Sequence, residues 1–131
     1  MTEHRAVVIE DDPDIALLIT TIIESMGYTV RTAQTGPAGI HAVRAVQPAV
    51  ITTDLGLPEM NGLEVIKAIR ERSHAPILVI SANHDPDTVE HALAAGANGF
   101  LPKPFRPGAL RDHLKELQND PAATNFPGQY S

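Results

Sequence analysis

The chain alternates short apolar runs with longer segments in which apolar residues recur at helical spacing. Continuous apolar or β-branched runs at 6–9, 50–53 and 77–80 are typical of strands covered on both faces of a parallel sheet, and the second run ends in the carboxylate of Asp54. The more polar run 28–33 predicts a strand at the sheet edge, and the short run 99–102 predicts a last strand. The pattern therefore predicts five strands.

Between these runs, apolar residues recur every three or four positions, which predicts five helices. Asp12 and Asp85 each stand before a proline, a sequence that favours an N-cap followed by a first helical residue. Gly27 ends the first helix, whose apolar stripe includes Leu18. The predicted helices are residues 13–26, 36–47, 63–70, 86–95 and 107–118.

Strands and helices that alternate in this way indicate an α/β fold. We expect a single five-stranded parallel sheet, doubly wound by helices on both faces as a (βα)5 unit. The pattern fills residues 1–118, which we interpret as one domain. Periodicity then ends, and Pro, Gly, Asn and Ala dominate residues 119–131, which we predict to be a mobile C-terminal tail.

Composition narrows the class of protein. With 131 residues, 43% of them hydrophobic and 20% charged, the chain has the makeup of one globular domain. A net charge of -6 speaks against direct binding to nucleic acid, and the lack of cysteine excludes disulfides. No apolar run approaches the roughly 20 residues that cross a bilayer. We therefore expect a cytoplasmic domain with no membrane partner.

Four predicted strands end beside residues that can carry chemistry. Glu10 and Asp11 follow the first strand, Asp54 ends the third, Ser81 follows the fourth, and Lys103 follows the fifth. The carboxyl ends of parallel strands share one edge of a sheet, so we expect these side chains to meet. Taken alone, Asp54 could equally well start a turn or cap a helix.

This set of residues suits phosphoryl transfer. Three converging carboxylates repel one another without a cation, and oxygen ligands of this kind suit Mg²⁺. A lysine and a hydroxyl nearby can stabilise the charge of a phosphoryl group. Since carboxylates form aspartyl-phosphates, Asp54 is the candidate nucleophile.

Several short motifs, in this order and spacing, resemble the receiver domain of two-component response regulators over about residues 5–118. The motifs are Val8-Ile9-Glu10-Asp11-Asp12, Asp54 with Leu57-Pro58 and Asn61-Gly62, Ser81-Ala82, Ala95-Gly96-Ala97 and Lys103-Pro104-Phe105. The resemblance implies the flavodoxin-like strand order 2-1-3-4-5 of chemotaxis-type receivers. It also implies a role in signal transduction through a phosphorelay.

The resemblance assigns a role to each matching residue. Asp54 is the phosphoacceptor, and its phosphoryl group comes from a histidine kinase or phosphotransfer protein. Asp11 ligates Mg²⁺ directly and Glu10 largely through water, together with Asp54 and the backbone carbonyl of Gly56. Ser81 and Lys103 bind the phosphoryl group, and the Lys103–Pro104 bond is expected to be cis. Such a protein is no enzyme in the usual sense, since it catalyses only its own phosphorylation and dephosphorylation.

Output in this family depends on a switch, which Ser81 and Phe100 match here. Phe100 lacks the hydroxyl of the tyrosine that is frequent at its position. We expect the face around residues 89–117 to bind a downstream protein partner. Many DNA-binding regulators have an acidic pair directly before this aromatic residue, where Asn98 and Gly99 stand here. They also have a charged pattern on the last helix, from which His113 departs. These departures speak against the salt-bridged dimer face of that subfamily.

Other interpretations stay open beside this one. The chain could act alone, or it could be a fragment of a longer regulator with an effector domain. It could also be a constitutive interaction module that is never phosphorylated. Two enzyme classes fit poorly: a flavodoxin-like enzyme needs an anion cradle where Glu10 and Asp11 stand, and a haloacid-dehalogenase-type phosphatase needs an acid at Gly56.

Overall fold

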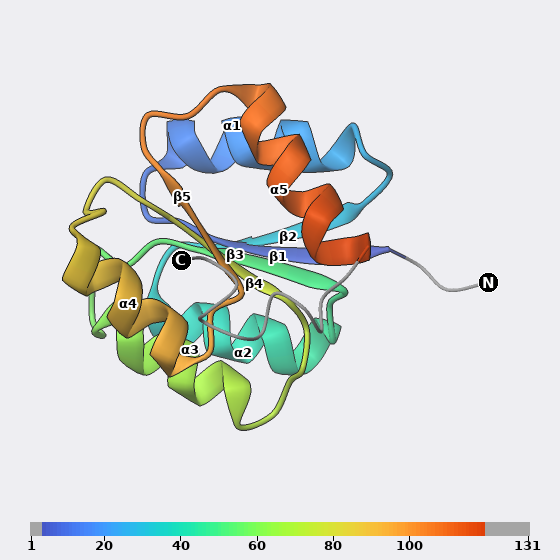
Figure 1. The fold of residues 1–131 in the computed structure, drawn as a ribbon. Helices are drawn as coiled ribbons and strands as arrows, with labels where there is room; N and C mark the ends of the chain where they lie inside the picture. The colour runs from blue at the N-terminus through green and yellow to red at the C-terminus, as the bar shows by residue number, and fades with distance from the viewer. Residues whose placement is uncertain (1–3, 120–131) are drawn as a thin grey trace.

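A computed structural model describes residues 4–119. Five parallel strands form one sheet in the order β2-β1-β3-β4-β5, which confirms the predicted fold class and strand order (Figure 1). The strands are β1 (Arg5–Ile9), β2 (Thr29–Ala33), β3 (Val50–Thr53), β4 (Ile77–Ser81) and β5 (Gly99–Pro102). The helices are α1 (Pro13–Glu24), α2 (Gly36–Val46), α3 (Gly62–Arg70), α4 (Pro86–Ala95) and α5 (Pro107–Asn119).

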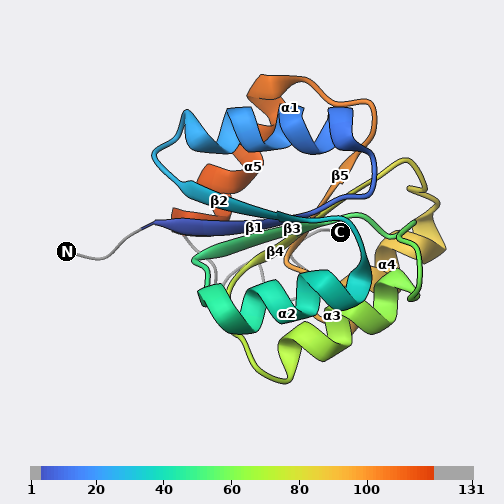
Figure 2. The same cartoon turned by 180° about the vertical axis from the view of Figure 1, so that it is seen from behind.

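Helices cover both faces of the sheet. Helices α1 and α5 lie on one face, and α2, α3 and α4 lie on the other (Figures 1 and 2). Each face has its own hydrophobic cluster, one around Val8 and Leu114 and the other around Val7 and Ile66. Strands β3 and β4 are buried throughout, as their unbroken apolar runs predict, whereas the edge strand β2 is largely exposed.

Strand register brings the ends of four strands to one edge. Ile9 pairs with Thr53, Thr53 pairs with Val79, and Ser81 pairs with Pro102. The residues that follow continue this alignment, because the amide of Asp54 donates to the carbonyl of Ile9 at 3.2 Å. The candidate site is therefore assembled by the sheet itself.

Helix starts follow their predicted caps, with small differences at the ends. Asp12 caps α1 by accepting hydrogen bonds from the amides of Asp14 and Ile15, whereas Asp85 stands at the N-cap of α4 without a side-chain cap bond.

Helix α1 ends at Glu24, two residues before its apolar stripe does. Helix α5 runs to Asn119, the first residue of the predicted tail, and residues 120–131 of that tail lie outside the described residues. Within residues 4–119, no helix has the length and apolar character to span a membrane.

Candidate functional site

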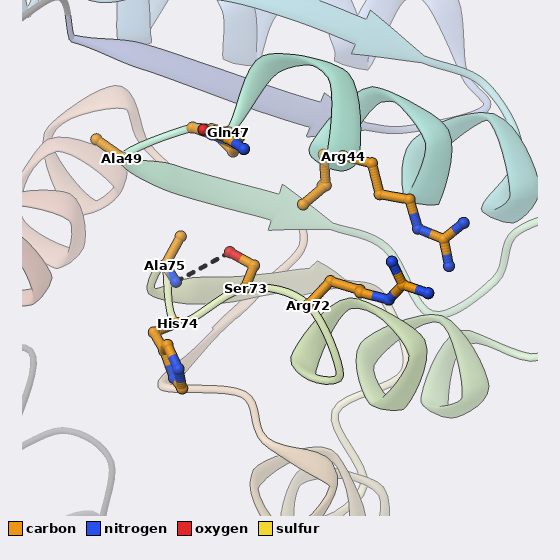
Figure 3. Close-up of a pocket in the computed structure, with 9 residues that line it drawn as sticks. Arg44, Gln47, Ala49, Arg72, Ser73, His74 and Ala75 are labelled. Atoms are coloured by element: carbon orange, nitrogen blue, oxygen red, sulfur yellow. Dashed lines mark hydrogen bonds between the residues drawn. The ribbon is translucent and has the colours of Figure 1, made fainter.

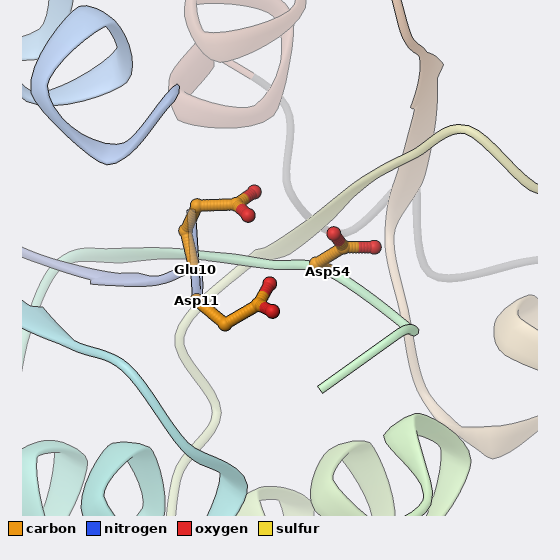
Figure 4. A group of neighbouring side chains, drawn as sticks. All are labelled: Glu10, Asp11 and Asp54. Atoms are coloured by element: carbon orange, nitrogen blue, oxygen red, sulfur yellow. The ribbon is translucent and has the colours of Figure 1, made fainter. Parts of the chain in front are cut away.

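Three carboxylates converge at the carboxyl edge of the sheet, as predicted. Glu10 and Asp11 follow β1 and Asp54 follows β3, and an oxygen of each lies within 4.8 Å of the others (Figure 4). Glu10 and Asp54 are buried, with 2% and 9% of their surface exposed, whereas Asp11 is exposed. Two of the three negative charges are therefore shielded from solvent, and the third faces it.

Lys103 joins the two buried carboxylates. Its Nζ lies 2.8 Å from Oε1 of Glu10 and 2.8 Å from Oδ2 of Asp54, and only 13% of its side chain is exposed. The lysine comes from the loop after β5, and the Lys103–Pro104 peptide is cis, as expected. A single ammonium thus bridges acids from two other strands.

The other oxygen of Asp54 is held by backbone donors. Oδ1 accepts hydrogen bonds from the amides of Leu55 at 2.6 Å and Gly56 at 3.2 Å. Ser81 is buried at the end of β4, and its hydroxyl oxygen accepts from the amide of Asn83 at 3.2 Å. Asp54, Gly56, Ser81 and Asn83 line a cleft of about 270 Å³, which leaves room beside the carboxylate.

The two buried carboxylates have pKa values shifted in opposite directions. Burial raises the pKa of Glu10, and the hydrogen bonds from Lys103 and the Asp12 amide only partly oppose it. Burial also acts to raise the pKa of Asp54, but Lys103, the Gly56 amide and Ser81 together outweigh it and lower that pKa. Asp54 has the more complete set of donors, so of these two acids it stays ionised more readily.

The two buried acids also shift the pKa of Lys103. Burial acts to lower its pKa, but the hydrogen bonds and charges of Asp54 and Glu10 raise it above the ordinary value. The ammonium therefore stays protonated, and it carries one positive charge against the three carboxylates. The excess of negative charge and the oxygen-only donor set fit a hard divalent cation such as Mg²⁺.

Ser81 and Phe100, the predicted switch residues, lie on adjacent strands. Phe100 is half-buried, pairs in register with Val79 and packs against the cluster on the α2–α3–α4 face. Two residues after Val79, β4 ends at Ser81, which lies beside Asp54. The end of β4 and the ring of Phe100 are therefore close enough for a displacement of one to affect the other.

Helix α1 presents an apolar surface beside the site that the sequence does not predict. Leu17 and Leu18 of α1 are 66% and 43% exposed, although Leu18 belongs to the predicted apolar stripe of this helix. Leu18 lines a cleft of about 360 Å³ together with Lys103 and Phe105. The only signal in the sequence is that the apolar stripe of this helix is wider than one buried face requires.

Comparison with known proteins gives one consistent result. The model of the family described as response regulator receiver domain matches residues 6–115. The chain is 33% identical over 123 residues to the DNA-binding response regulator MtrA of Mycolicibacterium smegmatis, covering 91% of this chain and 54% of that protein. It is 39% identical over 98 residues to the transcriptional regulatory protein KdpE of Mycobacterium tuberculosis, covering 75% of this chain and 43% of that protein.

Solved structures show the same relationship. The structure of the chemotaxis response regulator CheY4 of Vibrio cholerae has a TM-score of 0.82 at 29% identity, covering 88% of this chain and 99% of that one. The chain spans about half the length of the curated relatives it matches. Because one of these relatives is named as DNA-binding, the expectation that nucleic acid plays no part gains no support from them.

Proposed function

Because this chain belongs to the response regulator receiver domain family of two-component systems, we propose that it is a switch controlled by phosphorylation of Asp54. The phosphoryl group would come from a histidine kinase or phosphotransfer protein. The observation that carries the proposal is the Asp54 carboxylate itself, which is held ionised by Lys103 and two amides at the mouth of a cleft.

In the proposed transfer, a carboxylate oxygen of Asp54 bonds to phosphorus as the bond between phosphorus and the histidine nitrogen of the donor breaks. The lowered pKa of Asp54 keeps the nucleophile ionised at neutral pH. Lys103 and the Ser81 hydroxyl then stabilise the negative charge on the phosphoryl oxygens. Water later hydrolyses the acyl phosphate, and we propose that Asn83 orients this water.

Glu10, Asp11 and Asp54 would hold Mg²⁺, together with the backbone carbonyl of Gly56. Asp11 is exposed and suited to direct ligation, whereas Glu10 is already engaged by Lys103 and the amide of Asp12, which suits contact through water. When bound, the metal supplies charge neutralisation between the acids and an incoming phosphate. The protein's own contribution is to fix these oxygens at the edge of the sheet.

Output is proposed through the face around residues 89–117. A phosphoryl group on Asp54 would draw the Ser81 hydroxyl into a charge-assisted hydrogen bond. The shift opens space along β4, into which Phe100 can rotate from its half-buried position. Phosphorylation thereby biases an equilibrium between two conformations, and a downstream protein prefers one of them.

Intact-mass analysis after treatment with acetyl phosphate tests the phosphorylation step. We expect one added phosphoryl group in wild type with Mg²⁺, and none in Asp54→Asn or in EDTA. Asp85→Asn is the matched control, because it removes an acid from a neighbouring loop that takes no part in the cluster. An adduct that persists undiminished in Asp54→Asn would refute the assignment.

A further inference from the structure

A second cleft lies at the opposite edge of the sheet from Asp54. It has a volume of about 550 Å³ and is formed by the end of α2, the link into β3 and the link from α3 to β4 (Figure 3). Ala49 and Ala75 line it and stand directly before β3 and near the start of β4. Since parallel strands start at one edge and end at the other, this cleft is separate from the phosphoacceptor site.

Two arginines from different elements meet at this cleft. Arg44 comes from the last turn of α2 and Arg72 follows α3, and their guanidinium groups point toward one another (Figure 3). Within residues 4–119, neither guanidinium forms a hydrogen bond or an ion pair. Two like charges that face each other without a partner repel, and an anion between them would remove this repulsion.

Arg70 shows what a structural arginine looks like in the same region. It is half-buried, and its guanidinium donates to the carbonyl oxygens of Gly96, Ser73 and Ala75 and to the side chain of Asn98. These bonds tie α3 to the start of β4 and to β5. Arg72 lies two residues further on, is exposed to solvent and makes none of these bonds, so its guanidinium is accessible to a ligand at the cleft.

The rest of the lining favours an anion as well. Gln47 and His74 can donate hydrogen bonds, and the Ser73 oxygen already accepts from the amide of Ala75, which leaves its proton available. Among the described residues that line the cleft, none is acidic, although the chain carries a net charge of -6. Two guanidinium forks with hydroxyl and amide donors match the oxygens of a phosphate group.

The size of the cleft points to more than a free ion. Ligand sites for small molecules commonly measure about 300–1,000 Å³, and this cleft falls within that range. Val43 and Pro48 supply an apolar wall next to the arginines. We propose that this cleft is a second binding site of the domain, which takes a small phosphate ester with its phosphate between Arg44 and Arg72. The proposal stands independently of phosphorylation at Asp54.

Amide NMR spectra of the full chain, recorded without Mg²⁺, test this site. Adenosine monophosphate is the probe, with inorganic phosphate and adenosine as separate comparisons. We expect saturable shifts at Gln47, Ser73 and Ala75, with the amides of Asp54 and Ser81 unmoved. Inorganic phosphate should bind more weakly at the same amides, and adenosine should leave them unshifted.

Variants decide whether the two arginines are responsible. Arg44→Gln and Arg72→Gln should each weaken binding at least tenfold, because each removes one charged fork. Arg31→Gln, on the exposed strand β2, removes the same charge elsewhere and should leave the affinity unchanged. Equal weakening by Arg31→Gln, shifts that never saturate, or equal affinity for inorganic phosphate would each overturn the proposal.

Discussion

Lys103→Met should destabilise the metal-free domain more than any other single loss of charge near the site. In wild type the ammonium lies 2.8 Å from a carboxylate oxygen of both Glu10 and Asp54. Methionine keeps much of the length of the side chain but leaves the two acids without this cation. Glu10, of which only 2% is exposed, then keeps only the amide of Asp12 as a hydrogen-bond donor within residues 4–119.

The size of the effect follows from the burial of the pair. Removing one partner from a buried ion pair costs about 3–5 kcal/mol in the free energy of unfolding. Asp54 retains the amides of Leu55 and Gly56, so the lower end of this range, about 3 kcal/mol, is the expected loss at pH 8. For a domain of this size the melting temperature should fall by roughly 10 °C.

The loss should depend on pH. The folded pKa of Glu10 is already raised by burial, and without Lys103 it should rise further. A group whose pKa is raised on folding binds protons better in the folded state, so its contribution is present at low pH and is lost as pH rises. Lowering the pH from 8 to 5 should therefore recover part of the stability of the variant, as Glu10 takes up a proton.

Chemical denaturation in EDTA at pH 5 and pH 8 measures the free energy of unfolding of each protein. The proteins compared are wild type, Lys103→Met and the exposed control Lys115→Met. The control should match wild type at both pH values. Adding Mg²⁺ at pH 8 should reduce the deficit of Lys103→Met, because the ion again supplies positive charge to the cluster. A variant that unfolds at the wild-type free energy at pH 8, or whose deficit is the same at both pH values, would refute the reasoning.

Three further predictions concern the loops around the site and the sheet. Gly62→Ala should cost about 1–3 kcal/mol in denaturation experiments, because a Cβ there would lie 2.5 Å from Cα of Leu55, whereas Gly108→Ala meets nothing within 4 Å and should cost nothing. Asn98→Ala should cost about 1–3 kcal/mol, since its buried side-chain oxygen accepts from Arg70 and from the amide of Ile77, and equal stability would dismiss this role. A bulky residue at Gly56, where a Cβ meets open space, should slow the decay of phosphorylated protein, as should Asn83→Ala, and unchanged decay rates would contradict both.

Much of the fold could be predicted because it depends on local patterns. The apolar runs at 6–9 and 77–80 identify buried strands, and the alternation of elements identifies a parallel sheet with one functional edge. Glu10, Asp11, Asp54, Ser81 and Lys103 therefore come together as expected. Helix ends are harder to predict. The apolar stripe of the first helix continues to Met26 because the turn after α1 also packs against the core, although the helix itself has already ended.

Electrostatic details of the site could not be predicted in the same way. That Lys103 bridges both acids depends on the path of the loop after β5. The opposite pKa shifts of Glu10 and Asp54 depend on which backbone amides point at each carboxylate, and spacing carries no information on that. The meeting of Arg44 with Arg72 likewise follows from the packing of α2 beside α3, since no motif links them.

The separation of Glu10 and Lys103 along the chain has a consequence for the newly made protein. The two residues that form this ion pair stand 93 positions apart. At synthesis rates of about 5–20 residues per second, the lysine leaves the ribosome roughly 5–20 seconds after the acid. Lys103 stands 49 positions after Asp54, so for roughly 2–10 seconds of synthesis the nascent chain contains Asp54 without the ammonium that binds it in the folded domain. The proposed phosphoacceptor site is therefore complete only when the last strand has joined the sheet, because the loop that follows this strand brings Lys103 to Asp54.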